Sequence, residues 1–520
     1  MAEAQAVAEL VAEKRKLKKS LFRFDMIFFT VCAIVALDTI GQSSSYGAQA
    51  ILWLIVSAVT FLIPYGLITA ELGAAFPTEG ATYDWVRLAY GHFAGAVVGV
   101  LYWLSNPIWL GGTLAATTIA ALDALWGSSL GGNQFWETVI GFFFIWGAVT
   151  MNILSLRYMK WVPNLGAIIR LALLAFFALL VIVSGTQHGF HGTLAGFLPT
   201  DTTVLIGVIG VIVFQWIGFE LQTNASEEMD NPQRDIPRAV YASGVISFLG
   251  YAIPIVGVVL ILSSDELSNV SGFVAAYQFA SSSVLGGAAP FFNHLAALAF
   301  VFVLLSSGTT WLMGSDRLMA IGALAGSGPK QLGYFSERFG TPIVVNVLSG
   351  VIATVFMFIT FFVTGGGLHG YFAAVLGLVI STTTFSYILI FPSLLTLRRK
   401  YPNIRRPFVV PGGNAGAWIC VILTMFWVVA ATVFSLWPGL FTSTWLDDYS
   451  GVSRATYVLA KTIGRRAVVR TRLPLVMGRY SVTEPDVAVV PGQYEDYDDA
   501  HPRSALLVVE VADSRSSRTA

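Results

Sequence analysis

Eleven apolar segments, each about long enough to cross a membrane, dominate this chain of 520 residues. They lie at about residues 24–48, 50–75, 93–121, 136–154, 162–184, 203–225, 239–263, 290–314, 341–364, 370–396 and 414–438. A helix of roughly 20 apolar residues spans the hydrocarbon core of a bilayer. Hydrophobic residues make up 55% of the chain and charged residues 12%, which excludes a soluble globular protein. The pattern predicts an all-α polytopic membrane protein.

Lysines and arginines alternate between the predicted loops. The N-terminal segment, residues 1–23, carries six of them, and basic residues recur on the same side of the predicted spans. The opposite loops, around 123–134, 185–202, 264–286, 365–369 and 439–449, contain neither Lys nor Arg. Because cytoplasmic loops carry the excess of basic residues, we expect a cytoplasmic N terminus and a multi-pass protein of the cytoplasmic membrane. No cleavable signal is recognisable, so we expect the first span to remain in the protein.

Two of the spans lose their apolar character part of the way along. The first, from Ile34 to Gly47, contains Gly41, three serines and a final glycine, and the sixth is interrupted near Gly218. Interrupted spans at matching places in two halves of five helices indicate an inverted-repeat transporter, whose substrate binds between the breaks at the bilayer midplane. The alternative is that these glycines let helices pack closely. Since the breaks are paired, we favour the transporter.

Two stretches resemble a known family. Val211–Arg238 combines Gly218-Phe219-Glu220 with Asn231-Pro232 and Ile236-Pro237-Arg238, and resembles the sixth span and following loop of the amino acid-polyamine-organocation (APC) permeases. Thr69–Gly91 resembles the end of helix two of that family and its loop. The similarity covers about residues 20–450.

The resemblance implies a LeuT-like fold of 5+5 inverted repeats with discontinuous helices 1 and 6, in a permease domain at 24–450. It also implies secondary active transport of amino acids or related amines and polyamines by alternating access, coupled to protons or run as an exchange. The expected partners are a small-molecule substrate and the lipid bilayer, with no nucleic acid, no cofactor, no metal and no enzymatic activity. The sequence does not identify the substrate, the coupling ion or the oligomeric state.

Asp38 is a carboxylate beside the first break. APC permeases usually have a Gly/Ser-rich turn here that receives the substrate carboxylate, so an acid departs from the family pattern. One interpretation is that Asp38 replaces a carboxylate that the substrate lacks, which favours an amine, a polyamine or another cation. The other is that Asp38 caps the second half-helix. Thr39 and Gly41 on the same turn are further candidates for substrate binding.

Two more charges lie at predicted membrane depth. Glu220 aligns with the family's Gly-Phe-Glu acid, and the resemblance implies that its protonation is linked to gating, although it could equally be a structural hydrogen-bond acceptor. Arg170 occupies a region of helix five where proton-coupled relatives often have a lysine, thought to stand where sodium sits in sodium-coupled relatives. Arginine stays protonated, so Arg170 could imitate a bound cation but not carry a proton. Alternatively, its side chain reaches along the helix to the cytoplasmic face.

Aromatic and polar residues near the breaks complete the predicted site. Phe214 and Trp216 precede the second break, and we expect them, with Gly218, to flank a bound substrate. Asn106 on span three is a weaker candidate, as are Trp103 and Trp109. For the aromatic residues taken alone, ordinary packing is the simpler interpretation.

The C-terminal tail, residues 451–520, lacks a twelfth apolar segment, although APC permeases usually have twelve spans. Its short strand-like segments resemble a fragment of a PD-(D/E)xK restriction-endonuclease-like family, with Asp486 and Glu510 at metal-binding positions. Ala512 stands where a catalytic lysine is expected, and fewer than about 60 residues cannot enclose a nuclease core. A small α/β-type or disordered tail is therefore expected. The alternative functions are a membrane-tethered nuclease and a non-transporting amino acid sensor.

Overall fold

The computed structural model describes residues 21–126, 133–154, 160–199, 203–263, 267, 272–362 and 368–436, and the five short strands of the tail. The helices of the described chain, with π- and 3₁₀-helical turns labelled η, are α2 (Arg23–Ile34), α3 (Asp38–Ser44), α4 (Ala48–Ser57), η1 (Ala58–Leu62), α5 (Ile63–Ala75), α6 (Ala81–Tyr90), α7 (His92–Trp109), η2 (Leu110–Leu114), α8 (Ala115–Trp126), α9 (Gln134–Ile153), α11 (Trp161–His188), α12 (Thr203–Trp216), η3 (Leu221–Asn224), η4 (Ser226–Glu228), α13 (Pro232–Ile261), α14 (Gly272–Leu285), η5 (Gly286–Ala288), α15 (Ala289–Gly322), η6 (Ala323–Ser327), η7 (Lys330–Gly333), α16 (Ile343–Phe362), α17 (Leu368–Lys400) and α18 (Gly413–Leu436).

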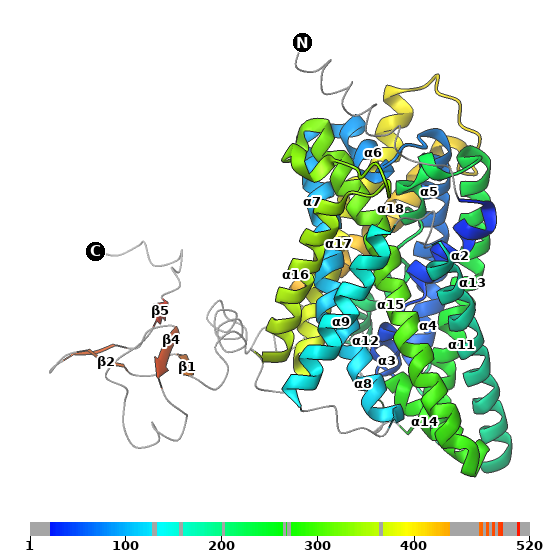
Figure 1. The fold of residues 1–520 in the computed structure, drawn as a ribbon, viewed down its shortest axis with the longest axis vertical. Helices are drawn as coiled ribbons and strands as arrows, with labels where there is room; N and C mark the ends of the chain where they lie inside the picture. Colours follow the sequence, from blue (N-terminus) through cyan, green and yellow to red (C-terminus); the bar gives the residue numbers. More distant parts are fainter. Residues whose placement is uncertain are drawn as a thin grey trace. The chain divides into compact units, whose positions relative to one another are not determined.

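Long apolar helices account for the predicted spans. Within the described residues, nine helices are long and apolar enough to cross a membrane, and there are ten if the bent pair α2 and α3 is counted as one span. The sixth predicted span contains α12, which has 14 residues and is therefore short for a complete crossing. Figure 1 shows the long helices running alongside one another. The prediction of a polytopic all-α membrane protein is confirmed.

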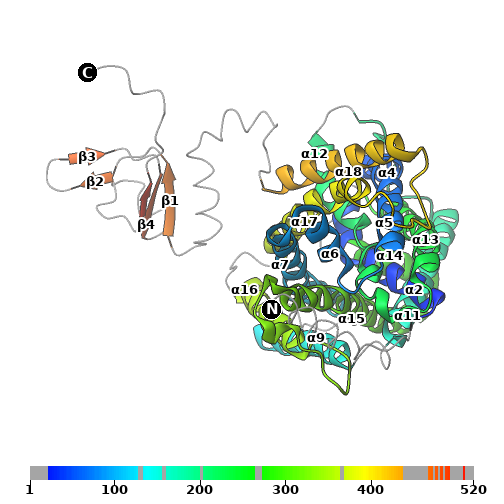
Figure 2. The ribbon, with the colours of Figure 1, turned by 90° about the horizontal axis from the view of Figure 1, so that it is seen from above.

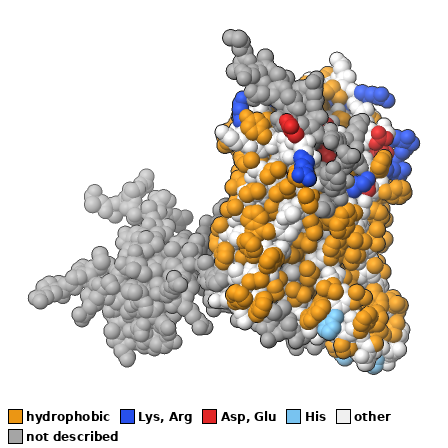
Figure 3. All heavy atoms as spheres, viewed as in Figure 1, with side chains coloured by type: hydrophobic (Ala, Val, Ile, Leu, Met, Phe, Trp, Pro, Cys, Tyr) orange, Lys and Arg blue, Asp and Glu red, His pale blue; other side chains and the backbone are white. Residues whose placement is uncertain are grey.

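Charged side chains gather at one end of the helices. Figure 3 shows hydrophobic side chains over most of this face, with Lys, Arg, Asp and Glu at the upper end. Hydrogen bonds and ion pairs bring together here the start of α2, the C-terminal ends of α5, α15 and α17, and the segment before α13, for example between Leu21 and Glu228 and between Arg398 and Glu71. We call this the basic end.

The helices pack in groups that put the two breaks side by side. The half-helices α2 and α3 contact α13, α12 contacts α3 and α4, and α5 contacts α13. On another side α15 contacts α7, α8 and α9, and α17 lies between α7 and α18. Figure 2, viewed along the helices, shows α15 and α9 at one side of the bundle and α12 and α18 at the opposite side.

A buried polar cluster joins the helices around α15. Asp316 is 1% exposed and accepts hydrogen bonds from Trp103 Nε1 at 3.0 Å, Ser349 Oγ at 2.7 Å and Asn152 Nδ2 at 3.0 Å. These donors come from α7, α16 and α9, so one carboxylate holds three helices against α15. Lipid tails are as apolar as the helix surfaces, so the hydrophobic effect does not drive helices together within a membrane. Interhelical hydrogen bonds of this kind stabilise their association.

The described part of the tail consists of short antiparallel strands. They are β1 (Ala467–Thr471), β2 (Leu475–Met477), β3 (Ser481–Thr483), β4 (Val487–Pro491) and β5 (Leu507–Val509). One sheet has the order β1-β4-β5, and β2 pairs with β3 in a second. The tail belongs to a compact unit separate from the helices. Asp486, Glu510 and Ala512, on which the nuclease resemblance depends, lie outside the described residues.

Candidate functional site

The first predicted span breaks where α2 ends at Ile34. α3 begins at Asp38, and the two half-helices are bent by 50°. Side chains satisfy the carbonyl groups of the last turn of α2: Arg170 binds Val31 and Cys32 at 3.0 and 2.6 Å, Trp311 Nε1 binds Ala33 at 2.9 Å, and the Tyr251 hydroxyl binds Ile34 at 2.6 Å. The end of a helix leaves carbonyl groups without a full set of helical partners, and backbone at membrane depth must be satisfied by protein. Here the side chains add to the backbone amides of Val35 and Ala36, which bind Val31 and Ile34. The break is therefore a stable feature, held by α11, α13 and α15.

The second break follows α12, which ends at Trp216. Gly218 has a φ of 137°, a backbone conformation that favours glycine. The Tyr65 hydroxyl on α5 accepts hydrogen bonds from the amides of Gly218 at 3.0 Å and Phe219 at 3.1 Å. One tyrosine thus satisfies two amides that the helix leaves without partners.

The two breaks touch each other. A Cβ atom at Gly218 would lie 3.0 Å from Ile34 Cγ1 and 3.6 Å from Ala33 Cβ. Gln215 Nε2 also donates to the carbonyl oxygen of Thr39 at 3.2 Å. The structure therefore has both predicted breaks and brings them together.

Asp38 lies at this junction, 1% exposed, as the first residue of α3. Its Oδ2 atom accepts a hydrogen bond from Trp109 Nε1 at 2.9 Å and one from Thr113 Oγ1 at 3.4 Å. Its Oδ1 atom is buried and has no hydrogen-bond partner among the described residues. The side chain is directed at α7 and η2, and no hydrogen bond from it caps α3.

Aromatic rings connect Asp38 with Glu220. The Trp109 ring packs edge-on against Phe214 and Trp311, with centroids 6.0 and 6.2 Å apart. Trp311 in turn packs against Tyr102 at 6.1 Å, and the Tyr102 hydroxyl donates to Glu220 Oε1 at 2.6 Å. The two acids therefore lie at opposite ends of one aromatic layer, built from α7, α12 and α15.

Glu220 is surrounded by tyrosines. Its carboxylate accepts hydrogen bonds from the hydroxyls of Tyr65, Tyr102 and Tyr387, which belong to α5, α7 and α17. Glu220 is fully buried, and no arginine or lysine pairs with it among the residues that the structure describes. Since its partners are three neutral donors and not a cation, the carboxyl group can be held either protonated or ionised. This arrangement suits both a proton carrier and a structural acceptor.

Arg170 is fully buried in α11 and lies against the first break. Besides the two carbonyls of α2, its guanidinium donates to the carbonyl of Val303 at 3.1 Å and to Ser307 Oγ at 2.5 Å on α15. All four acceptors are neutral oxygens, the ligand type that a hard monovalent cation would meet. The side chain therefore does not extend to the basic end, as the alternative interpretation supposed.

The other predicted residues divide between the junction and its surroundings. Thr39 is at the junction, through its contacts with Gln215. Gly41 packs against α14, since a Cβ at Gly272 would lie 3.3 Å from Gly41 Cα. Trp216 faces away, because its Nε1 donates to Ser57 Oγ at 2.8 Å and its ring packs on Phe248 and Tyr251. Asn106 bonds to the carbonyl of Tyr102 in its own helix at 2.9 Å.

Sequence reasoning missed the tyrosines around Glu220 and the role of Trp311. It ranked Trp109 below Phe214, although Trp109 is the residue that binds Asp38. Tyr65, Tyr102 and Tyr387 come from three helices, and no spacing in the sequence links them. Within the described residues, no group of three His, Cys, Asp or Glu side chains could hold a metal ion.

Two broken helices that meet beside buried charges, within a bundle of spanning helices, define a membrane transporter of small solutes. The comparisons agree, because residues 21–446 match the model of the amino acid permease family. The chain belongs to this family and is an APC-superfamily permease. The family match ends at residue 446, and no comparison supports the nuclease resemblance of the tail or a sensor function.

Similar proteins include transporters of amines and of amino acids. A probable agmatine/putrescine antiporter of Lactococcus lactis is 29% identical over 426 residues, which cover 81% of this chain and 89% of that protein. A glutamate/gamma-aminobutyrate antiporter of the same organism is 23% identical over 72% of this chain and 71% of its own length. A branched-chain amino acid permease of Bacillus subtilis is 22% identical over 82% of this chain and 91% of its own length.

Proposed function

We propose that this permease transports an amine that has no carboxylate, such as a diamine or a guanidino amine, and that Asp38 binds its cationic group. The observation that carries the proposal is the state of Asp38: a buried carboxylate at the meeting point of the two breaks, with one oxygen unpartnered among the described residues. A buried carboxylate oxygen without a partner is costly. The cationic group of a substrate would supply a donor and a charge to pair with it.

The neighbouring rings suit a cation as well. Trp109 binds Asp38, and the rings of Phe214 and Trp311 pack against Trp109. Aromatic faces attract ammonium and guanidinium groups, Trp most strongly. The agmatine/putrescine antiporter that resembles this chain is consistent with such a substrate.

Recognition of a substrate carboxylate is less well supported. In a zwitterion site of this kind, free amides at the breaks would bind the carboxylate. Here three such amides are occupied, because Ala36 donates to the Tyr251 hydroxyl at 2.9 Å, and Gly218 and Phe219 donate to Tyr65. Asp38 would in addition repel a second anion.

The proposal extends to the remaining elements of the mechanism. Glu220 is the group that takes up and releases a proton, Arg170 stands in for a bound cation at the first break, and the two five-helix halves form a LeuT-like inverted repeat that alternates access. Transport runs as exchange or with protons, without a cofactor. The basic end faces the cytoplasm, together with the N terminus, and the protein resides in the cytoplasmic membrane.

Ligand binding to the purified protein tests the substrate class. Putrescine and agmatine should raise the melting temperature, since a ligand at 100 times its Kd stabilises the folded state by about 2.7 kcal/mol. Leucine and glutamate should not. Asp38→Asn should weaken amine binding by about 2 kcal/mol or more, because a buried charge pair is lost. Asp316→Asn, the same change at a buried acid outside the junction, is the matched control and should keep amine binding.

Flux measurements distinguish a transporter from a binding protein. Proteoliposomes loaded with putrescine should take up labelled agmatine or putrescine, and Asp38→Asn should abolish this uptake. The amine proposal is wrong if leucine or glutamate stabilises the protein and is taken up while the amines have no effect. It is also wrong if Asp38→Asn binds amines as tightly as the unaltered protein.

A further inference from the structure

An apolar groove runs between α4–α5 and α13. It has a volume of about 550 Å³, and its walls include Ile63 and Gly66 on one side and Tyr241 and Gly244 on the other. Its outer residues are open to the surroundings: Ile63 is 55% exposed and Tyr241 77%. In a membrane protein this surface faces lipid, so the groove is a recess in the lipid-facing wall.

The groove has the length of one lipid chain. Its lining on α13 extends from Pro237 to Phe248, which is roughly 16 Å of helix. The hydrocarbon core of a bilayer is about 30 Å thick, so one leaflet contributes roughly 15 Å. A single acyl chain entering from the basic end would fill the groove along its length.

The basic end of the groove carries unpaired positive charge. Arg234 and Arg238 precede Tyr241 and Val245 on α13, at the three- and four-residue spacing that places side chains on one helix face. Both arginines are exposed, and neither side chain has an ion pair or hydrogen bond among the described residues. Asp235 is the acidic residue of this helix turn. Two guanidinium groups thus stand where an apolar chain in the groove would meet its headgroup.

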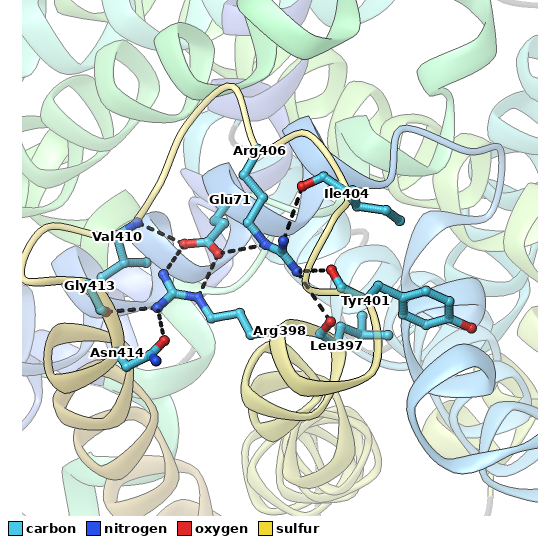
Figure 4. A network of polar contacts seen from close by, with 9 residues as sticks. All are labelled: Glu71, Leu397, Arg398, Tyr401, Ile404, Arg406, Val410, Gly413 and Asn414. Atoms are coloured by element: carbon cyan, nitrogen blue, oxygen red, sulfur yellow. Dashed lines mark hydrogen bonds and ion pairs between the residues drawn. The ribbon is translucent and has the colours of Figure 1, made fainter.

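The loop after α17 contributes to the wall of the groove. Phe408 from that loop joins the lining. Figure 4 shows how Glu71, on α5, fixes the loop: it pairs with Arg398 at 2.5 Å and Arg406 at 3.5 Å and accepts a hydrogen bond from the amide of Val410 at 2.7 Å. The part of the wall that this loop forms is therefore held in place by Glu71.

The floor of the groove is part of the second break. Phe219 lines it, and the ring fits between two glycines, since a Cβ at Gly244 would lie 3.4 Å from Phe219 Cζ and one at Gly66 3.9 Å from Cε2. The same ring packs edge-on against Tyr65 at 5.1 Å, and Tyr65 donates to Glu220. An occupant of the groove would touch the residue next to Glu220.

We propose that this groove binds one anionic phospholipid, with an acyl chain against Phe219 and its phosphate on Arg234 and Arg238. Arginine binds phosphate oxygens through paired N–H donors, and anionic lipids attract basic residues beside a spanning helix. Because the chain lies against Phe219, the lipid supports the broken segment of span six. Lipid binding does not depend on which solute the permease carries.

Native mass spectrometry of the delipidated full-length protein tests the proposal. Phosphatidylglycerol and phosphatidylcholine with identical acyl chains are titrated separately. The first molecule of phosphatidylglycerol should bind at a lower lipid concentration than the first molecule of phosphatidylcholine, by a factor of at least roughly five for each arginine that binds the phosphate. Replacing both Arg234→Gln and Arg238→Gln should abolish this preference. Ile63→Trp, which places a ring in the groove, should weaken binding of both lipids.

Two exposed positions outside the groove provide matched controls. Arg338→Gln removes a charge that stacks on Phe339 in another loop, and Ile422→Trp enlarges a 60% exposed residue of α18. Both should bind lipid like the unaltered protein. The proposal is overturned if the double arginine variant still prefers phosphatidylglycerol, if Ile63→Trp binds both lipids normally, or if Ile63→Trp changes the oligomeric state instead, which would mark the groove as a contact between two copies of the chain. If the unaltered protein binds the lipid as expected but does not transport amines, the proposed function is contradicted and the lipid site is retained.

Discussion

Arg170 donates a hydrogen bond of 2.6 Å from Nη1 to the carbonyl oxygen of Cys32, in the last turn of the first half-helix. The same guanidinium reaches α15 through Val303 and Ser307. A helix C-terminus carries partial negative charge, so a cation is stabilising there. Arg170 therefore joins the broken span to a continuous helix, α15.

Removal of this charge should destabilise the protein. Arg170→Met removes the four hydrogen bonds that the buried guanidinium donates to α2 and α15, which we expect to cost about 3 kcal/mol or more. Arg170→Lys keeps the charge but offers a more compact group that reaches fewer acceptors, so its loss should be smaller. Thermal unfolding in detergent measures both. An unchanged melting temperature in Arg170→Met would show that the break is held without Arg170.

Glu220 should determine how transport depends on pH. Glu220→Gln has nearly the same shape and can still accept hydrogen bonds from the tyrosines, but it cannot take up or release a proton. We expect pH-driven uptake to be lost while exchange at constant pH persists. Uptake and exchange in proteoliposomes over a series of pH values measure the difference.

Tyr387→Phe is the control for the Glu220 prediction. It removes one hydroxyl donor and leaves the carboxyl group, so uptake should still vary with pH. If Glu220→Gln keeps the pH dependence of the unaltered protein, Glu220 is a structural acceptor and the proton is carried elsewhere.

The sequence predicted the spans and the breaks because both are local features. An apolar run of about 20 residues can be recognised without its neighbours, and so can a loss of apolar character beside glycines and serines. Asp38, Glu220 and Arg170 were singled out for a similar reason, since a charge in an apolar run is conspicuous by itself. The structure finds all three buried at or beside the breaks.

What the sequence could not predict depends on side-chain direction and on contacts between distant segments. Trp216 is next to a break but points toward α13, and position along the chain does not determine the face of an irregular turn. Tyr65, Tyr102 and Tyr387 are separated by long stretches of sequence, and a tyrosine in an apolar helix resembles any other packing residue. Their common partner, Glu220, is evident in three dimensions alone.

The ion pairs of Glu71 should contribute to stability more than an exposed pair does. Glu71 is 1% exposed and Arg398 11%, so Glu71→Gln leaves two arginines close together without a carboxylate, at a cost of about 3 kcal/mol. The control is Asp84→Asn, which breaks the more exposed pair with Arg87 and should cost less than about 1 kcal/mol. Thermal unfolding compares the two variants, and equal losses would show that burial of the Glu71 pair has no energetic consequence.

Gly218→Ala should destabilise the second break more than a Gly→Ala substitution inside a helix destabilises that helix. The φ of 137° at Gly218 strains any other residue by about 1–3 kcal/mol. The new methyl group would also lie 3.0 Å from Ile34 Cγ1 and 3.3 Å from Trp311, which forces the two breaks apart. We expect a lower melting temperature and loss of transport. Gly377→Ala in α17, where a Cβ would meet nothing within 4 Å, should change stability by less than about 1 kcal/mol and leave transport intact. If the two variants behave alike, close contact between the broken segments is not required for transport.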